Sequence, residues 1–362
     1  MTTGSPLAAD YREARQRFLD AAAGAGASPT AFDHPTETGP DGGPLAIDVA
    51  QLGPADSPAV LLVVSGTHGV EGYAGSAIQT DWLERLGAGS PPSGLRVVLI
   101  HALNPYGFAW TRRTNEDNVD LNRNFIDWDE PPPDNPAYDQ LADALVPDRW
   151  DDATKEATTM TLLAEVERLG LEEMQRVVSG GQYRHERGVF YGGTGPVWSR
   201  RWLTDHIGSL AEPATRVGII DLHTGLGPWG HGELIVHGSR AEPGYRRAER
   251  WWGDVRSMQD GESVSAELSG GWLGRIEALL PEIEVTAAAL EFGTVDAIQV
   301  LQALRGEAWL HGQDRSVVEG PEGAQVRAEV RRAFLDDGPD WLPTLLGRFD
   351  QVATAAVAGL DA

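Results

Sequence analysis

The chain has 362 residues, of which 41% are hydrophobic, and it contains no cysteine. That length is enough for one large α/β domain or two smaller ones, and the missing cysteines exclude disulfides, a thiolate nucleophile and a Cys-ligated metal. The formal net charge of −25 argues against nucleic acid and anionic membranes as partners. No apolar run approaches the roughly 20 residues that a membrane span needs, and residues 1–26 lack a secretory signal pattern. We therefore expect a cytoplasmic protein of open oligomeric state.

Apolar patterns in the first third of the chain predict strands that alternate with helices. The expected elements, in chain order, are a helix at 10–24, a loop at 25–44, strands at 45–52 and 59–65, a helix at 74–87 and a strand at 95–103. The strands are continuously apolar, which is typical of a sheet that is covered on both faces.

A rigid polar break follows at residues 129–136, where the sequence is DEPPPDNP. The elements expected after it are helices within 137–180, strands at 216–223, 232–238 and 285–293, a helix near 296–311 and one or two helices within 322–360. The segment 181–202 is aromatic, Gly-rich and basic within an acidic protein, and it is a candidate specificity element. We expect a single domain of residues 1–362, with 130–215 as an elaboration near the active site.

Polar side chains recur at the ends of the predicted strands. His68 and Glu71 follow the run 59–64, and Asn104 follows the strand at 95–103. His223 and Glu291 stand at the ends of two later strands. Ligands of open α/β sheets bind outside the carboxyl ends of the strands, so this recurrence indicates one site better than any of the residues does alone.

Three of these residues match the requirements of a catalytic zinc ion. Zinc accepts imidazole nitrogen and carboxylate oxygen, and catalytic sites keep three protein ligands and one water. His68 and Glu71 are three residues apart, and His223 supplies a distant third ligand. Glu291 lies in an almost fully apolar strand, where it is either a base that takes a proton from water or a buried carboxylate that pairs with an arginine.

The segment 104–125 is the densest polar stretch of the chain. Guanidinium groups bind carboxylates through two parallel hydrogen bonds, so its arginines are candidates for holding a carbonyl oxygen or a carboxylate of a substrate. The alternative is that these arginines neutralise nearby aspartates. The candidate residues are Arg112, Arg113, Asn122 and Arg123, and the neighbouring carboxylates are Asp117 and Asp120.

Four blocks in this order resemble the zinc carboxypeptidases, the M14 metallopeptidase family, and in particular its uncharacterised branch DUF2817. The blocks are HGVE, NPYGF with VDLNRNF, DLHTG and LEFGT, and the resemblance spans residues 45–310. It implies a mixed, twisted sheet of about eight strands with helices on both faces, an α/β architecture.

The resemblance also implies roles for individual residues. His68, Glu71 and His223 match the ligands of one Zn²⁺ per chain, Glu291 matches the general base, Arg113 or Arg112 matches the arginine that polarises the scissile carbonyl, and Asn122 with Arg123 matches the pair that grips a terminal carboxylate. Asp221, two residues before His223, is a candidate for orienting that ligand.

Two departures from the carboxypeptidase pattern concern specificity. No tyrosine stands at the place of the family's mobile tyrosine shortly before the catalytic glutamate; Tyr183, Tyr191 or Tyr245 are candidate substitutes, the first two as substrate-binding residues. The first motif carries Gly69 and Val70 where digestive members have an additional arginine.

Three functions are compatible with the sequence. The first is a zinc-dependent hydrolase of carboxypeptidase type, which cleaves an amide bond of a peptide or small molecule bearing a carboxylate by metal-activated water with a Glu general base. The second is a deacylase of the aspartoacylase/succinylglutamate desuccinylase type, which acts on small N-acyl amino acids or esters. The third is a catalytically silent binding protein that retains the fold.

Overall fold

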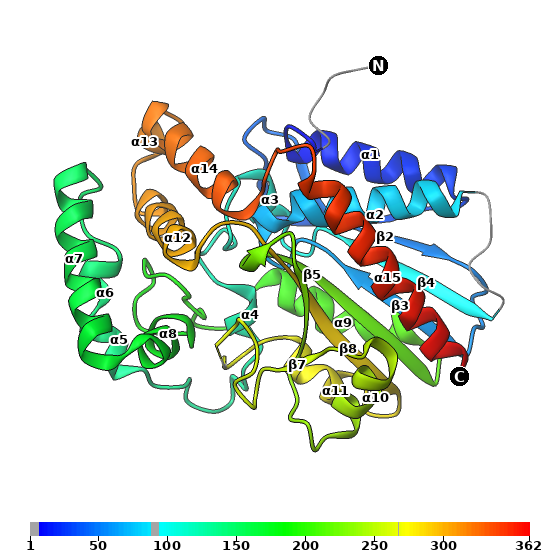
Figure 1. The fold of residues 1–362 in the computed structure, drawn as a ribbon. Helices are drawn as coiled ribbons and strands as arrows, with labels where there is room; N and C mark the ends of the chain where they lie inside the picture. The colour runs from blue at the N-terminus through cyan, green and yellow to red at the C-terminus, as the bar shows by residue number, and fades with distance from the viewer. Residues whose placement is uncertain (1–6, 88–93, 267) are drawn as a thin grey trace.

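A computed structural model describes residues 7–87, 94–266 and 268–362. Its centre is a mixed, eight-stranded sheet with the strand order β1-β2-β4-β3-β5-β8-β6-β7 and with helices on both faces (Figure 1). The predicted fold class is confirmed. Residues 1–6, which belong to the stretch considered for a secretory signal, lie outside the described residues.

The parallel strands occupy the middle of this sheet, where β3 pairs with β4 and β5, and β5 pairs with β8. Antiparallel pairs flank them, namely β1 with β2, β2 with β4 and β6 with β8, and the short edge strand β7 pairs in parallel with β6. The strands are β1 Thr30–Thr38, β2 Pro44–Leu52, β3 Ala59–Val64, β4 Leu95–His101, β5 Arg216–Trp229, β6 Gly232–Val236, β7 Arg256–Ser257 and β8 Glu284–Gly293.

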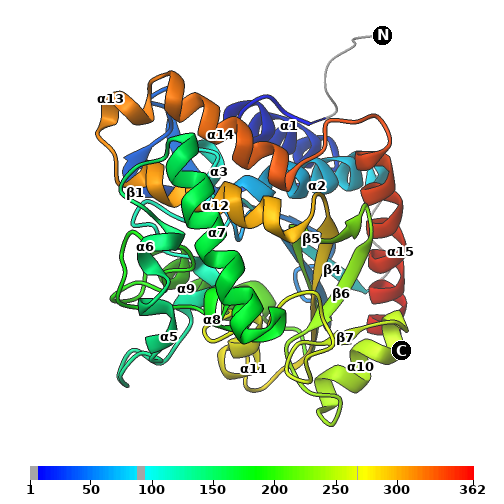
Figure 2. The same ribbon diagram turned by 60° about the vertical axis from the view of Figure 1, so that its left-hand side comes forward.

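Helices connect and cover these strands (Figure 2). They are α1 Tyr11–Gly24, α2 Gly72–Leu86, α3 Pro105–Ala109, α4 Leu121–Asn124, α5 Pro136–Asp139, α6 Ala142–Leu145, α7 Asp152–Leu169, α8 Leu171–Ser179, α9 Trp198–Ala211, α10 Pro243–Trp252, α11 Ile276–Leu279, α12 Ala297–His311, α13 Arg315–Val318, α14 Pro321–Phe334 and α15 Trp341–Asp361, with short 3₁₀ turns at Gly69–Glu71 and Leu273–Arg275. Helices α5 to α8, within the expected elaboration, lie together on one side of the molecule (Figure 1).

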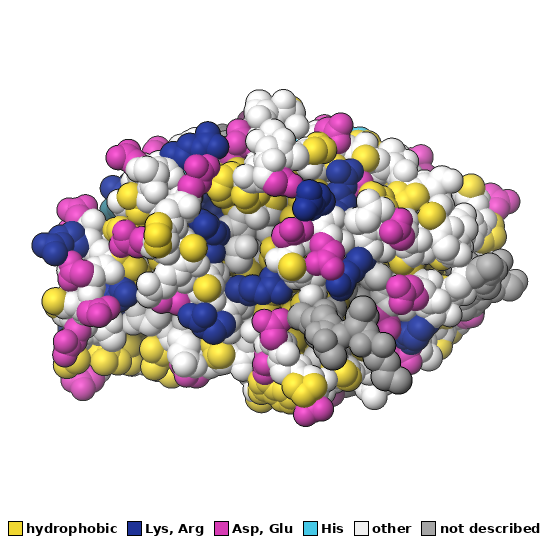
Figure 3. All heavy atoms as spheres, turned by 90° about the horizontal axis from the view of Figure 1, so that it is seen from above, with side chains coloured by type: hydrophobic (Ala, Val, Ile, Leu, Met, Phe, Trp, Pro, Cys, Tyr) yellow, Lys and Arg dark blue, Asp and Glu magenta, His cyan; other side chains and the backbone are white. Residues whose placement is uncertain are grey.

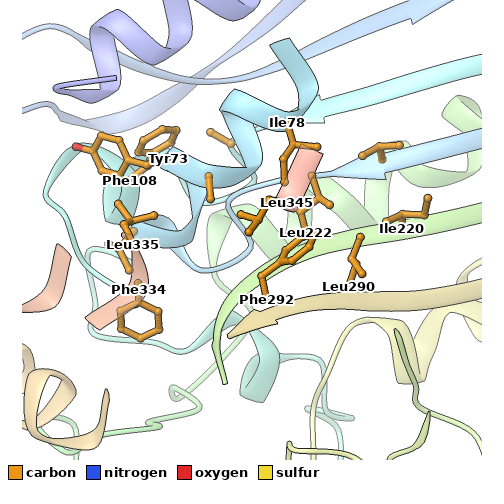
Figure 4. Close-up of a cluster of buried hydrophobic side chains, with 14 of the residues drawn as sticks. Tyr73, Ile78, Phe108, Ile220, Leu222, Leu290, Phe292, Phe334, Leu335 and Leu345 are labelled. Atoms are coloured by element: carbon orange, nitrogen blue, oxygen red, sulfur yellow. The ribbon is translucent and has the colours of Figure 1, made fainter. Parts of the chain in front are cut away.

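The core forms two layers because successive side chains of a strand point to opposite faces of the sheet. In β3, Leu61 and Val63 pack in the layer beneath α1, α2 and α15, whereas Val60 and Leu62 pack with α9 on the other face. Figure 4 shows part of the first layer, where strand residues meet α2 and the C-terminal helices. Its labelled side chains are Tyr73, Ile78, Phe108, Ile220, Leu222, Leu290, Phe292, Phe334, Leu335 and Leu345.

Two predictions about elements need correction. The expected loop at 25–44 is wrong over Thr30–Thr38, which forms the edge strand β1. This strand is mostly exposed and polar, so it lacks the apolar signal of the interior strands. The strand expected at 216–223 continues to Trp229, through Gly225 and Gly227 at positive φ, and its register with β8 shifts in that extension.

Within the part of the chain that the structure describes, no helix is both long enough and apolar enough to cross a membrane.

Candidate metal centre

The middle strands bring four of the predicted residues to one edge of the sheet. His68 and Glu71 lie just past β3, His223 lies in β5 and Glu291 lies in β8. These three strands are adjacent and parallel, and His223 is the direct neighbour of Glu291 in the register. Their carboxyl ends therefore meet, as the pattern of polar residues at strand ends predicts.

His68, Glu71 and His223 form a compact triad of buried side chains, whose ligand atoms all lie within 4.8 Å of one another. Nδ1 of His68 lies 2.9 Å from Oε1 of Glu71, and Nδ1 of His223 lies 2.9 Å from Oε2. The two Nδ1 atoms are 3.2 Å apart. Ligands bonded to one zinc ion at about 2.0–2.2 Å stand roughly 3.4 Å apart in a tetrahedron, so the triad needs only small shifts to fit one.

Each imidazole has a buried carboxylate at its other nitrogen. Nε2 of His223 lies 2.7 Å from Asp221 Oδ2, and Nε2 of His68 lies 3.3 Å from Asp120 Oδ1. At His223 the Asp221 carboxylate fixes the tautomer that carries its proton on Nε2, and this leaves the Nδ1 lone pair free to bind a metal. At His68, Nε2 faces both Asp120 and the Arg113 guanidinium, and Nδ1 faces Glu71 as Nδ1 of His223 does.

The electrostatics of this site favour a cation. Two lone pairs and a carboxylate at these distances repel one another unless a proton or a metal ion lies among them. Burial lowers the pKa of His223, but Asp221 and Glu71 outweigh it, so the pKa stands well above its usual range. Burial likewise raises the pKa of Glu71, but the two imidazoles lower it further than burial raises it. The donor set fits zinc, which binds nitrogen and oxygen.

Asp221 is itself held by two donors. Thr67 Oγ1 donates to Oδ1 at 2.8 Å, and Trp272 Nε1 donates to Oδ2 at 2.7 Å.

We expect Asp221→Ala to weaken zinc binding by about 10- to 100-fold, because His223 loses the carboxylate that orients it. Competition with a chromogenic chelator measures this affinity. Asp205→Ala, on the exposed side of α9, is the control and should leave the affinity unchanged.

The turn that carries His68 and Glu71 is bonded to the arginine segment. Gly69 N donates to the Arg113 carbonyl at 3.1 Å, and Val70 N donates to the Arg112 carbonyl at 2.7 Å. A Cβ atom at Gly69 would lie 2.0 Å from the carbonyl carbon of Gly107, so only glycine allows this approach of two backbones. The contact explains why glycine stands at this position in the motif.

Replacing Gly69 with alanine should therefore destabilise the protein by about 3 kcal/mol, because neither backbone can move away cheaply. Chemical denaturation measures this change in the free energy of unfolding. Gly208→Ala is a matched control in α9, where an added Cβ meets nothing within 4 Å. That control should raise stability by about 0.5–1 kcal/mol, and an equally stable Gly69→Ala protein would contradict the expectation.

Glu291 lies beside the triad and is 7% exposed. Its Oε1 accepts the backbone N–H of Leu226 at 3.0 Å. Burial and the neighbouring Glu71 carboxylate raise its pKa to about 8. Among the described residues no arginine or lysine forms an ion pair with Glu291, although the nearby charge of Arg113 lowers its pKa in part.

The two adjacent arginines point in different directions. Arg113 donates from Nη1 to Glu71 Oε1 at 2.9 Å and from Nε to Asp120 Oδ2 at 3.1 Å, and its Nη2 lies 2.9 Å from His68 Nε2. Arg112 turns away, into a network with Glu307, His311 and the residues 114–118. Of the two, only Arg113 lies against the triad. It also neutralises Asp120, as the alternative interpretation of this segment expected.

The remaining predicted substrate residues surround Arg123, which is 3% exposed. Arg123 donates through Nε to the Ser179 carbonyl and through Nη1 to the Asn122 carbonyl, both at 3.0 Å. Tyr183 donates its hydroxyl to the Arg123 carbonyl at 2.6 Å, whereas Tyr191 packs in the core layer beneath α9. The side-chain oxygen of Asn122 accepts the backbone N–H of Trp272 at 3.3 Å. Their assignment to substrate binding stays a prediction.

Comparison with known proteins identifies the family. Residues 7–348 match a protein family of unknown function, DUF2817. The chain belongs to this family. No match was found among curated proteins.

Several solved structures are similar in fold to the DUF2817 chain. The structure of thrombin-activatable fibrinolysis inhibitor matches it with a TM-score of 0.50 and 12% identity, over 99% of this chain and 79% of that one. Carboxypeptidase A from Helicoverpa armigera matches with a TM-score of 0.46 and 12% identity, over 91% and 75% of the two chains. A candidate metallopeptidase from Shewanella denitrificans OS217 matches with a TM-score of 0.43 and 14% identity, over 96% and 98%.

Sequence reasoning missed some residues that shape the site of this DUF2817 protein. Asp120 was considered only as a partner for arginine, yet it also faces His68. Trp272 and Glu307 come from segments with no polar pattern of their own. Glu307 accepts the backbone N–H of Arg113 at 3.0 Å and thereby anchors that residue to α12. The VDLNRNF block, which contains Asp120, is the one sequence motif that could have indicated its role.

Proposed function

We propose that this protein is a zinc-dependent hydrolase that cleaves an amide bond in a small substrate bearing a carboxylate. The observation that carries the proposal is the position of Glu291, which neighbours His223 on the next strand and lies beside a triad of metal-ligand type. A silent binding protein has no need of an unpaired buried carboxylate at that point, because burying it costs free energy.

Each residue has a role in this chemistry. His68, Glu71 and His223 would hold the zinc ion, which supplies a water of lowered pKa and polarises a carbonyl oxygen. Glu291 takes a proton from water and returns it to the leaving amine, and its burial beside Glu71, which raises its pKa, favours the acceptance of a proton. Arg113 directs its guanidinium at the same place and stabilises negative charge that develops on the carbonyl oxygen.

A second candidate is the deacylation of small N-acyl amino acids. The specific observation in its favour is burial: the triad residues are 4%, 1% and 4% exposed, and Glu291 is 7% exposed. A small acyl amino acid reaches such a site more easily than the C-terminus of a folded protein does.

One experiment separates these functions. The protein is purified without chelator, its zinc is measured by elemental analysis, and hydrolysis is followed on C-terminal dipeptides and on short N-acyl amino acids. About one zinc per chain with dipeptide turnover supports the carboxypeptidase type, whereas turnover of N-acyl amino acids alone supports the deacylase. No bound metal, with no activity after zinc is added, would overturn both.

A further inference from the structure

Phe190 occupies an unusual place between the two arginines that face Asp120. The Arg113 guanidinium carbon lies 5.6 Å from the centroid of its ring, and the Arg123 guanidinium carbon lies 5.2 Å from it. Asp120 contacts both arginines as well, with 3.1 Å to Arg113 Nε and 3.8 Å to Arg123 Nη1. The two cations therefore share one carboxylate and one aromatic ring.

The backbone of Phe190 is held in a strained conformation. Its φ of +55° lies in the left-handed region, which bulky residues rarely adopt. The segment is fastened on both sides of the residue: Gln182 N donates to the Phe190 carbonyl at 3.2 Å, Asp120 N donates to the Tyr191 carbonyl at 2.8 Å, and the Tyr138 hydroxyl donates to the Val189 carbonyl at 3.0 Å. Residues whose surroundings hold them in a strained backbone conformation are found most often at functional sites.

These contacts have an electrostatic consequence. Two guanidinium groups near one another repel, and the proximity of Arg113 is one cause that lowers the pKa of Arg123, after burial. The negative face of an aromatic ring attracts cations and leaves their N–H edges free to donate. The half-buried Phe190 ring thus keeps the two guanidinium groups together and occupies none of the N–H groups that remain beyond their contacts with Glu71, Asp120, Ser179 and Asn122.

We propose that Phe190 is a positioning residue, which holds Arg113 and Arg123 as one anion-binding pair beside the triad. The proposal rests on the proposed function for its substrate, an N-acyl amino acid with a free carboxylate. It also gives a role to the aromatic, Gly-rich segment 181–202, which contains Phe190. Phe190 acts through the arginines and takes no part in the proton transfers.

The test compares two ligands in calorimetric titrations: N-acetylglycine, which carries a carboxylate, and N-acetylglycinamide, which does not. The wild type should prefer the acid, and Phe190→Leu should lose about tenfold in affinity for the acid alone, because two cation–π contacts disappear. Phe190→Trp keeps an aromatic face and should retain the preference. Phe349→Leu, in the core against Trp82, is the control: it lowers stability and should leave the preference intact.

Three results would overturn the proposal: a wild type without preference for the acid, an unchanged preference in Phe190→Leu, or an equal loss in the leucine and tryptophan variants. Hydrolysis of the same acid is followed in parallel. If the wild type binds the acid with the expected preference, and Phe190→Leu loses it, but neither this acid nor the substrate panel is cleaved after zinc is added, then the proposed hydrolase fails and the role of Phe190 stands.

Discussion

Glu291→Gln should reduce kcat by roughly 10³-fold while zinc remains bound in full. Glutamine has nearly the same shape and keeps an oxygen that can accept the Leu226 N–H, so the strand and the site should survive the change. It cannot accept the proton from water, however, and the reaction loses its base. Steady-state kinetics on the best substrate of the panel, together with elemental analysis, measure both quantities on one preparation.

Glu284→Gln is the matched control, because Glu284 lies in the same strand at its exposed far end. This variant should behave as the wild type does in both assays. Full turnover by Glu291→Gln would show that another group takes the proton. A loss of zinc from Glu291→Gln would mean that the residue is a metal ligand, and the proposed division of roles would be wrong.

His68→Ala should remove both metal and activity. The triad offers three ligand side chains, and two ligands rarely hold a zinc ion against a chelator, so we expect the zinc content to fall from about one to below about 0.1 per chain. The substitution also leaves Asp120 without the imidazole that faces it, so a modest loss of stability should accompany the loss of metal. Elemental analysis, circular dichroism and the hydrolysis assay are run on the same sample.

The control for this substitution is His206→Ala. His206 belongs to α9, where it stacks on Trp202 on the far side of the sheet from α2, and it should keep metal and activity. A folded His68→Ala protein that still binds one zinc would exclude His68 as a ligand. A folded variant without zinc that still turns over the substrate would exclude metal-dependent hydrolysis.

Much of the site could be predicted because its residues follow apolar strands. The runs that become β3, β5 and β8 are buried on both faces, and such runs stand out in a sequence. His68, Glu71, His223 and Glu291 lie at or near the ends of those runs, so the topology of a parallel sheet brings them together. The blocks around them carry the resemblance to zinc carboxypeptidases.

Other parts could not be predicted, for identifiable reasons. β1 is an exposed polar edge strand without an apolar pattern. The two neighbouring arginines are alike in sequence, and their directions depend on acceptors that lie far away in the chain, such as Glu307 for Arg112 and Glu71 for Arg113. Phe190 follows Arg123 by 67 residues, and no local sequence pattern indicates which side chains its ring will contact.

The large separation of the two histidines along the chain links metal binding to folding. His68 and His223 are 155 residues apart, so their nitrogens meet only after β3 and β5 have paired. An unfolded or truncated chain therefore offers no comparable site, and a zinc ion held by the triad would bind the native state selectively. Under such linkage, zinc at 1,000 times its dissociation constant adds about 4 kcal/mol to the free energy of unfolding. Zinc supply would thus set how long a molecule resists proteolysis as well as whether it reacts.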